Sequence, residues 1–62
     1  METTNYAVIK DLAARIARGY NPLYGETRSV NVFRDGKTVN ITYTITPVNV
    51  AAAFEFNARR SH

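Results

Sequence analysis

The chain has 62 residues, with eight lysines and arginines against five acids, a formal net charge of +3 and no cysteine. This length allows one small domain over residues 1–62, and because cysteine is absent and the only histidine is His62, we predict no disulfide, metal or cofactor. Because no apolar run approaches the roughly 18–20 residues of a membrane span and no signal-peptide pattern opens the chain, we expect a cytoplasmic protein that makes no membrane contact.

The first segment, from about Asn5 to Arg18, has the periodicity of an amphipathic helix. Its apolar positions recur at three- and four-residue spacing, namely Val8 or Ile9, Leu12, Ala13 and Ile16. Gly19 follows directly, and glycine readily adopts the left-handed backbone conformation that ends helices. The sequence therefore predicts one helix that stops at Gly19.

Two tyrosines, Tyr20 and Tyr24, lie in the connection that follows the helix, where Leu23 is expected to enter the core. A tyrosine ring can close the open end of a small core while its hydroxyl stays in water, and this is the first interpretation. In the second interpretation the tyrosines join neighbouring arginines in a contact surface, because tyrosine and arginine are enriched at interface hot spots. The arginines concerned are Arg15, Arg18 and Arg28.

A β-hairpin is predicted around the dipeptide Asp35-Gly36, a strong signal for a two-residue hairpin turn. Apolar and polar residues alternate on both sides of it, and pairing outward from the turn sets Val32 opposite Val39 and Val30 opposite Ile41. Both apolar sets then share one face. The opposite face is polar and nearly uncharged, with Asn31, Phe33, Thr38, Asn40, Thr42 and Thr44.

The segment 47–58 fits two structures. As a strand it alternates without a fault through Val48, Val50, Ala52, Phe54 and Phe56, and as a helix it has Thr46 as cap, Pro47 in the first turn and three alanines. We predict the strand. The fold class expected is α+β, with one N-terminal helix packed on a three-stranded antiparallel meander (αβββ), and the alternative is αββα with a C-terminal helix.

The third strand has two consequences for the surface. It is an apolar sheet edge that lacks a protecting lysine or proline, and such edges pair with another chain, so we expect self-association, as a homodimer through the edge strand or the sheet face. The sheet face would also include Asn49, Ala51 and Ala53. The strand would end beside the hairpin turn and gather four cations there, namely Arg34, Lys37, Arg59 and Arg60.

No histidine, cysteine or pair of carboxylates falls inside the predicted fold, so we expect no enzymatic activity and no small-molecule substrate. The function predicted is that of a small protein-binding accessory protein of phage, plasmid or bacterial type, an adaptor or inhibitor of a larger protein. Its partner-binding residues would be Arg18, Tyr20, Tyr24, Arg28, Asn31, Phe33 and Asn40. The alternative is a basic nucleic-acid-binding regulator that contacts phosphates through Arg34, Lys37, Arg59 and Arg60.

Overall fold

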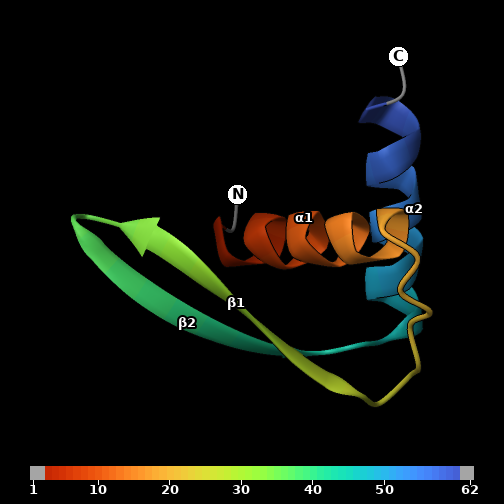
Figure 1. Cartoon of the computed structure of the whole chain (residues 1–62), viewed down its shortest axis with the longest axis horizontal. Helices are drawn as coiled ribbons and strands as arrows, with labels where there is room; N and C mark the ends of the chain where they lie inside the picture. The colour runs from red at the N-terminus through yellow and green to blue at the C-terminus, as the bar shows by residue number, and fades with distance from the viewer. Residues whose placement is uncertain (1–2, 61–62) are drawn as a thin grey trace.

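The computed structural model describes residues 3–60 and has the element order helix, strand, strand, helix (Figure 1). The elements are α1 (Thr3–Ala17), β1 (Thr27–Arg34), β2 (Lys37–Thr44) and α2 (Pro47–Arg60). The three-stranded meander predicted above is therefore wrong, because the sheet of the described residues consists of β1 and β2 alone. The element order is that of the αββα alternative.

Helix α2 begins with a capping arrangement encoded in the sequence. The backbone N–H of Asn49 donates a 3.1 Å hydrogen bond to Thr46 Oγ1, and the N–H of Val50 donates one of 2.9 Å to the Thr46 carbonyl. Pro47 occupies the first helical position, where its missing N–H costs nothing. The alanines that follow are the best helix formers. Local chemistry therefore favours a helix here, against the alternation of apolar residues.

The strand pattern failed because α2 needs only one apolar face. Val50 and Ala53, three residues apart, are buried against the rest of the molecule, whereas Val48 and Phe54 are 77% and 54% exposed. The regular alternation from Val48 to Phe56 thus included side chains that the fold leaves in solvent. The expected sheet face is corrected as well, since Ala53 is fully buried and neither Asn49 nor Ala51 belongs to a strand.

Helix α1 and its end agree with the sequence prediction to within two residues. Gly19 adopts a φ of +105°, and its N–H donates to the Ile16 carbonyl at 2.9 Å. The N–H of Tyr20 donates to the Arg15 carbonyl, also at 2.9 Å. These two bonds form a Schellman motif, which satisfies carbonyls at the helix end and turns the chain toward β1.

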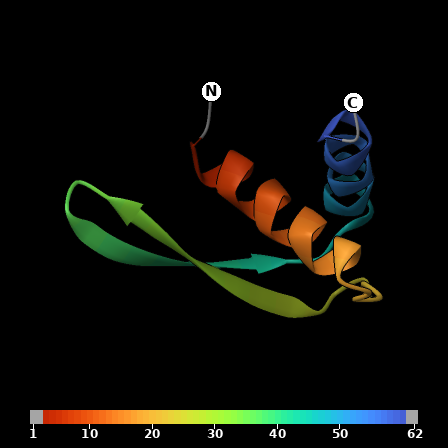
Figure 2. The same ribbon diagram turned by 45° about the horizontal axis from the view of Figure 1, so that its top comes forward.

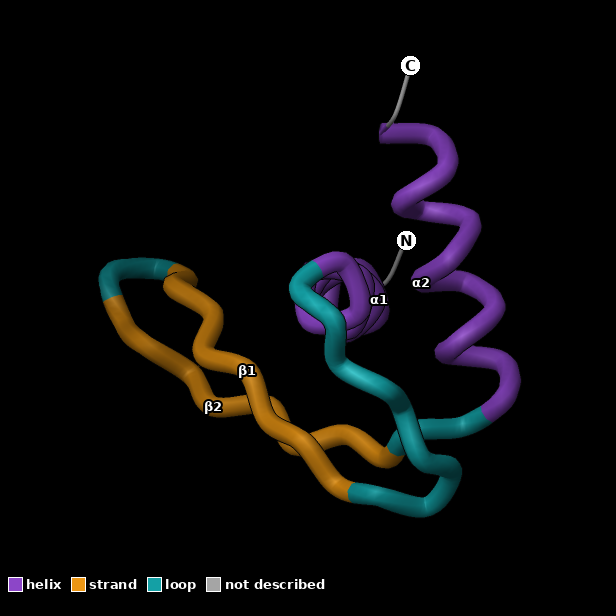
Figure 3. The backbone as a smooth tube through the Cα atoms, turned by 45° about the vertical axis from the view of Figure 1, so that its right-hand side comes forward, coloured by secondary structure: helices purple, strands orange, loops and turns teal. Residues whose placement is uncertain are grey.

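The hairpin register is confirmed: Val32 pairs with Val39 and Val30 with Ile41 in an antiparallel ribbon. The two central turn residues both have positive φ, 53° for Asp35 and 74° for Gly36, as a type I′ turn requires. Figure 3 shows the twist of this ribbon, and in Figure 1 its turn lies beyond the N-terminal end of α1.

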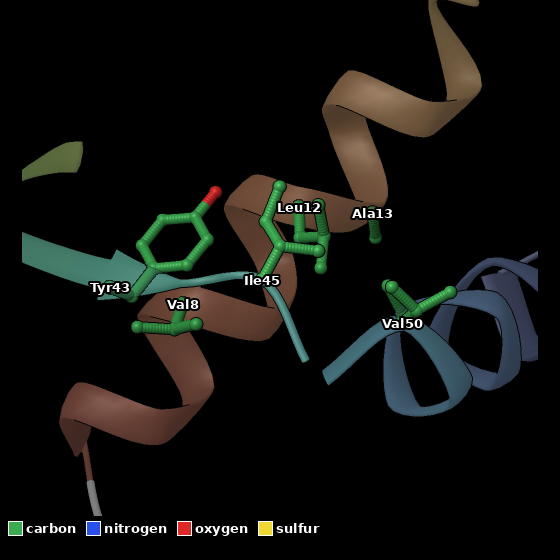
Figure 4. Packing of buried hydrophobic residues seen from close by; sticks show 7 residues of the cluster. Val8, Leu12, Ala13, Tyr43, Ile45 and Val50 are labelled. Carbon is green, nitrogen blue, oxygen red and sulfur yellow. The ribbon is translucent and has the colours of Figure 1, made fainter. Parts of the chain in front are cut away.

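The core lies at the base of the hairpin, where α1 packs against the hairpin and against α2 (Figure 4). Leu12 of α1 and Ile45, just after β2, are its fully buried large side chains. Leu23, expected in the core, is 59% exposed, because Tyr20 instead packs against the cluster at this corner. The buried members are Val8, Leu12, Ala13, Tyr43, Ile45, Val50 and Ala53.

Candidate functional site

Asp11 attaches α1 to both strands of the hairpin. Its Oδ2 accepts a 2.7 Å hydrogen bond from the Tyr43 hydroxyl and a 3.0 Å bond from Arg15 Nε, and Arg15 Nη2 donates at 3.2 Å to the Ser29 carbonyl. Burial and the bond to Asp11 raise the pKa of Tyr43 to about 12, and the bond to Asp11 raises the pKa of Arg15. These contacts hold α1 across the hairpin base.

Beyond these contacts, an open groove separates α1 from β1. Its volume is about 430 Å³, within the usual range of ligand sites. Figure 2 shows α1 crossing above the base of the ribbon while the distal ribbon continues past it. The groove is lined by the apolar residues Tyr6, Ala7, Ala14, Val30, Val32 and Phe33, together with Lys10, Asp11 and Asn31.

The groove stays open for two reasons that the sequence explains. Ala7 and Ala14 have side chains too short to reach β1, and the distal hairpin extends past the part of the ribbon that the core covers. Apolar surface remains exposed as a result: Phe33 is 75% exposed and Val39 is 42% exposed. Tyr6 is held at the groove wall by an edge-on contact with the Phe56 ring of α2, with centroids 6.1 Å apart.

The outer edge of β1 is capped near the core and free further out. Because Arg34 and Lys37 close the two-residue turn as a hydrogen-bonded pair, alternate β1 residues (Thr27, Ser29, Asn31 and Phe33) direct their backbone groups away from β2. The carbonyls of the first two accept side-chain bonds from Arg28 (2.9 Å) and Arg15 (3.2 Å). The outward backbone groups of Asn31 and Phe33 form no hydrogen bond with any described residue, and both residues line the groove.

The edge of β2 has a similar division. Asn49 Nδ2 donates a 3.0 Å bond to the Thr44 carbonyl near the core. The outward groups of Thr38, Asn40 and Thr42 have no recorded backbone partner. This second edge does not line the groove.

Two of the predicted partner-binding residues, Tyr20 and Arg28, form a structural corner. The Tyr20 hydroxyl donates to Glu26 Oε1, Arg28 Nη2 lies 3.0 Å from Glu26 Oε2, and the Arg28 guanidinium lies 5.0 Å from the Tyr20 ring centroid. The bond from Tyr20, aided by the charge of Arg28, lowers the pKa of Glu26, and the same bond raises the pKa of Tyr20. The hydroxyl expected in water is therefore bonded.

The remaining predicted partner-binding residues lie apart from that corner. Tyr24 and Arg18 are exposed, and no recorded ion pair or ring contact joins them to Tyr20 or Arg28. Asn31, Phe33 and Asn40 lie on the ribbon, where Asn40 Nδ2 donates a 2.9 Å bond to Asn31 Oδ1. The groove thus includes two of the predicted residues, Asn31 and Phe33.

The four cations assigned to phosphate contacts do not meet. Arg34 and Lys37 flank the hairpin turn, whereas Arg59 lies near the end of α2, 3.7 Å from Glu55. Figure 1 places the hairpin turn and the end of α2 on opposite sides of the molecule. Arg60 is the last residue of α2, and its side chain lies outside the described part of the structure. The grouping failed because it depended on a third strand.

Among the described residues, charge pairing leaves Lys10 beside the groove without an acidic partner. Within the described part of the chain, Asp11, Glu26 and Glu55 each pair with an arginine. Lys10 lines the groove and forms no recorded ion pair. The groove therefore combines apolar walls, a free strand edge and an unpaired positive charge.

Four residues that line the groove were not predicted from the sequence as surface residues of interest, namely Tyr6, Ala7, Lys10 and Ala14. A signal was present, since Ala7, Lys10 and Ala14 follow the i, i+3, i+7 spacing of one helix face beside the core stripe. This helix face can be recognised as a groove wall only when β1 is known to run alongside it. Local spacing alone does not show this.

Comparison with protein-family models, with curated proteins and with solved structures finds no significant match to this chain. Residues 3–60 contain no group of three or more His, Cys, Asp or Glu side chains placed to hold a metal ion. Neither of the two described helices has the length and apolar character needed to cross a membrane. The function must therefore be argued from the groove and the hairpin.

Proposed function

We propose that this chain is a non-enzymatic protein-binding module, an adaptor or inhibitor that docks on a larger protein through the groove between α1 and β1. The carrying observation is an apolar groove of about 430 Å³ that runs beside an uncapped strand edge. Apolar surface next to free backbone groups is the combination that extended protein segments recognise.

The side chains around the groove support a macromolecular partner. Phe33 is 75% exposed, and Tyr6 is half exposed and already held by Phe56. Aromatic side chains with few rotatable bonds contribute contact area at low entropic cost and are enriched at the centres of interfaces. A partner that covers Phe33 and Tyr6 removes from water the apolar area that this small core leaves uncovered.

The titratable groups with shifted pKa values support the non-enzymatic part of the proposal. Each of these pKa shifts is caused by burial or by a hydrogen bond to another side chain of the fold. The groups are Tyr43, Arg15, Tyr20 and Glu26. Asp11, which lines the groove, is already bound by Tyr43 and Arg15. These groups are committed to holding the fold together rather than to proton transfer.

The test compares partner capture by the wild-type chain and by a chain whose groove is filled. Ala7→Arg places a long side chain in the groove wall, and Ala51→Arg makes the same change on an exposed position of α2 as a matched control. Affinity capture from a lysate of the source cells, read by quantitative mass spectrometry, is expected to give a partner with wild type and Ala51→Arg and to lose it with Ala7→Arg. A partner retained equally by all three chains refutes the groove, and no enriched partner refutes the function.

A second candidate function, nucleic-acid binding, is favoured by the shape of the hairpin. A two-stranded ribbon fits the major groove of DNA, and here the turn carries Arg34 and Lys37 while the polar face carries Asn31 and Asn40. Only two of the four cations first assigned to phosphates are at this turn. We therefore place this function second, and a salt titration described below distinguishes it.

Self-association is retained as a separate proposal, with a changed basis. The apolar edge strand that motivated a homodimer is helix α2, so that surface cannot pair with a second sheet. The free edges are those of β1 and β2. Light scattering over a concentration series tests it. For a homodimer the average mass should rise with concentration toward twice the monomer mass, and a constant monomer mass refutes self-association.

A further inference from the structure

The free edge of β1 offers backbone groups to one more strand. Within residues 3–60 the outward N–H and C=O groups of Asn31 and Phe33 have no partner, whereas the outward carbonyls of Thr27 and Ser29 are already bonded to arginines. Pairing is therefore available along a short distal stretch and blocked nearer the core. An incoming strand is limited to the part of the edge that borders the groove.

The groove walls are arranged for alternate side chains of such a strand. On β1, Val30 and Val32 point to the same face of the ribbon, and Ala7 and Ala14 of α1 line the other side of the groove. Side chains of a strand point alternately to its two faces. Every second residue of a segment added at this edge would thus enter the space under α1, and apolar side chains suit that space.

Charge defines the segment further. Lys10 lines the groove and pairs with no acid of the described residues, while the acid next to it, Asp11, is bound by Arg15 and Tyr43. A partner carboxylate near Lys10 would therefore find an uncompensated cation. A basic segment would find like charge.

Resting on the proposed function, we propose that the groove binds an extended acidic segment of a partner protein, which pairs with Asn31 and Phe33 as a third strand. Its alternate residues are apolar and enter the groove, and at least one carboxylate approaches Lys10. A second copy of this chain fits less well, because the β1 sequence TRSVNVFR carries two arginines and no acid to pair with Lys10.

The probe for this inference is a phage-displayed library of random peptides selected on the immobilised full-length chain. Selected peptides are expected to show period-two apolar residues with acids between them, and a synthetic peptide of that sequence should shift the amide NMR signals of Asn31 and Phe33. Selection of basic or helix-period peptides, of no peptide at all, or of a peptide that shifts signals elsewhere overturns the inference. The capture experiment with Ala7→Arg and Ala51→Arg does not depend on this peptide selection. If that capture succeeds and the selection fails, the groove still binds a partner but not an acidic strand.

Two proline variants test strand addition directly. Asn31→Pro removes an outward N–H from the β1 edge, and Asn40→Pro removes the outward N–H of its cross-strand neighbour on β2. Both changes abolish the same Asn40–Asn31 side-chain bond, so they are matched in what they cost the hairpin. We expect Asn31→Pro to weaken peptide binding by at least about tenfold and Asn40→Pro to leave it near wild type. Equal affinities for the two variants would disprove pairing at β1.

A charge reversal provides a test that does not alter the backbone. With Lys10→Glu as the selection target, the acidic preference of the peptides should change to a basic one, and Arg18→Glu, also exposed and unpaired but outside the groove, should leave it unchanged. An unaltered preference in Lys10→Glu refutes the charge assignment. If the wild-type chain forms a concentration-dependent dimer and Asn31→Pro is monomeric, the β1 edge binds a second copy of the chain instead. If the chain binds DNA and no peptide, the hairpin binds nucleic acid instead.

Discussion

The Tyr43 hydroxyl on β2 donates a 2.7 Å hydrogen bond to Asp11 Oδ2 on α1, across 32 positions of sequence. The same carboxylate oxygen accepts from Arg15 Nε at 3.0 Å, and Arg15 also reaches the Ser29 carbonyl of β1. One carboxylate thereby links the helix to both strands. The link lies beside the core contacts between α1 and the hairpin, and Asp11 itself lines the groove.

We expect Tyr43→Phe to lower the free energy of unfolding by roughly 1–2 kcal/mol near neutral pH, because it leaves Asp11 without its hydroxyl donor. Denaturant unfolding followed by circular dichroism measures this. Tyr24→Phe, at an exposed tyrosine, is the control for loss of a hydroxyl and should change little.

The pH dependence of the same pair follows from the raised pKa of Tyr43. The unfolded chain releases this proton near pH 10, whereas the folded chain retains it to about 12. Over that window the folded state binds more protons, so stability falls as pH rises, by at most about 1.4 kcal/mol per pH unit. Tyr43→Phe should lose less stability than wild type between pH 10 and 12, and parallel curves for the two proteins would contradict the assignment.

The two apolar residues Ile45 and Phe54 should respond very differently to truncation. Ile45 is fully buried, so Ile45→Ala is expected to cost about 2–5 kcal/mol, enough to unfold a chain this small. Phe54 is 54% exposed, and Phe54→Ala should cost no more than about 1 kcal/mol. Urea unfolding of both variants decides between the observed helix and a strand at 48–56, which would bury Phe54 and raise the cost of Phe54→Ala to that of Ile45→Ala.

The cap of α2 gives a second test of the helix. Thr46→Ala removes the oxygen that accepts from the Asn49 N–H and should cost about 0.5–2 kcal/mol, whereas Thr46→Ser keeps that oxygen and should cost much less. Thermal unfolding and the helical signal in far-ultraviolet circular dichroism report the difference. If the two variants have the same stability, the hydroxyl does not cap α2.

Replacing the turn cations separates the two candidate functions. Arg34→Ala with Lys37→Ala removes two exposed positive charges beside the turn and leaves the groove lining intact. We expect capture of a protein partner to be almost unchanged. Duplex DNA binding, measured by fluorescence anisotropy against salt, should in contrast weaken and lose up to about two units of salt slope if the hairpin contacts phosphates. A wild-type chain that binds no nucleic acid at low salt eliminates that function.

The helix α1, its end at Gly19 and the hairpin register were all predictable from the chain. Each depends on residues a few positions apart: the three- and four-residue apolar spacing, the left-handed glycine, and the Asp35-Gly36 turn that pairs Val32 with Val39. Such interactions form between neighbours whatever the rest of the molecule does. Two residues of the candidate site, Asn31 and Phe33, were predicted to bind a partner because of their place on the ribbon. The groove that they line was not predicted.

The choice between strand and helix at residues 47–60 depended on distant contacts. Its local preferences conflicted, with alternation favouring a strand and the Thr46 cap and alanines favouring a helix. Packing resolved the conflict, because Ala53 and Val50 fit against α1 and Asn57 Nδ2 reaches the Ala13 carbonyl at 3.0 Å. The small side chains Ala13 and Ala53 allow this close approach of two helices.

By itself, the sequence therefore determined those parts of the protein whose stabilising contacts are local: one helix, its stop, and a two-stranded ribbon in register. The tertiary structure decided between the conflicting local signals at α2, and it alone decided that Asp11 holds α1 to both strands and that Lys10 and Ala7 face β1 across a groove. These features arise between segments far apart in the chain, and no spacing within either segment specifies how the two will meet.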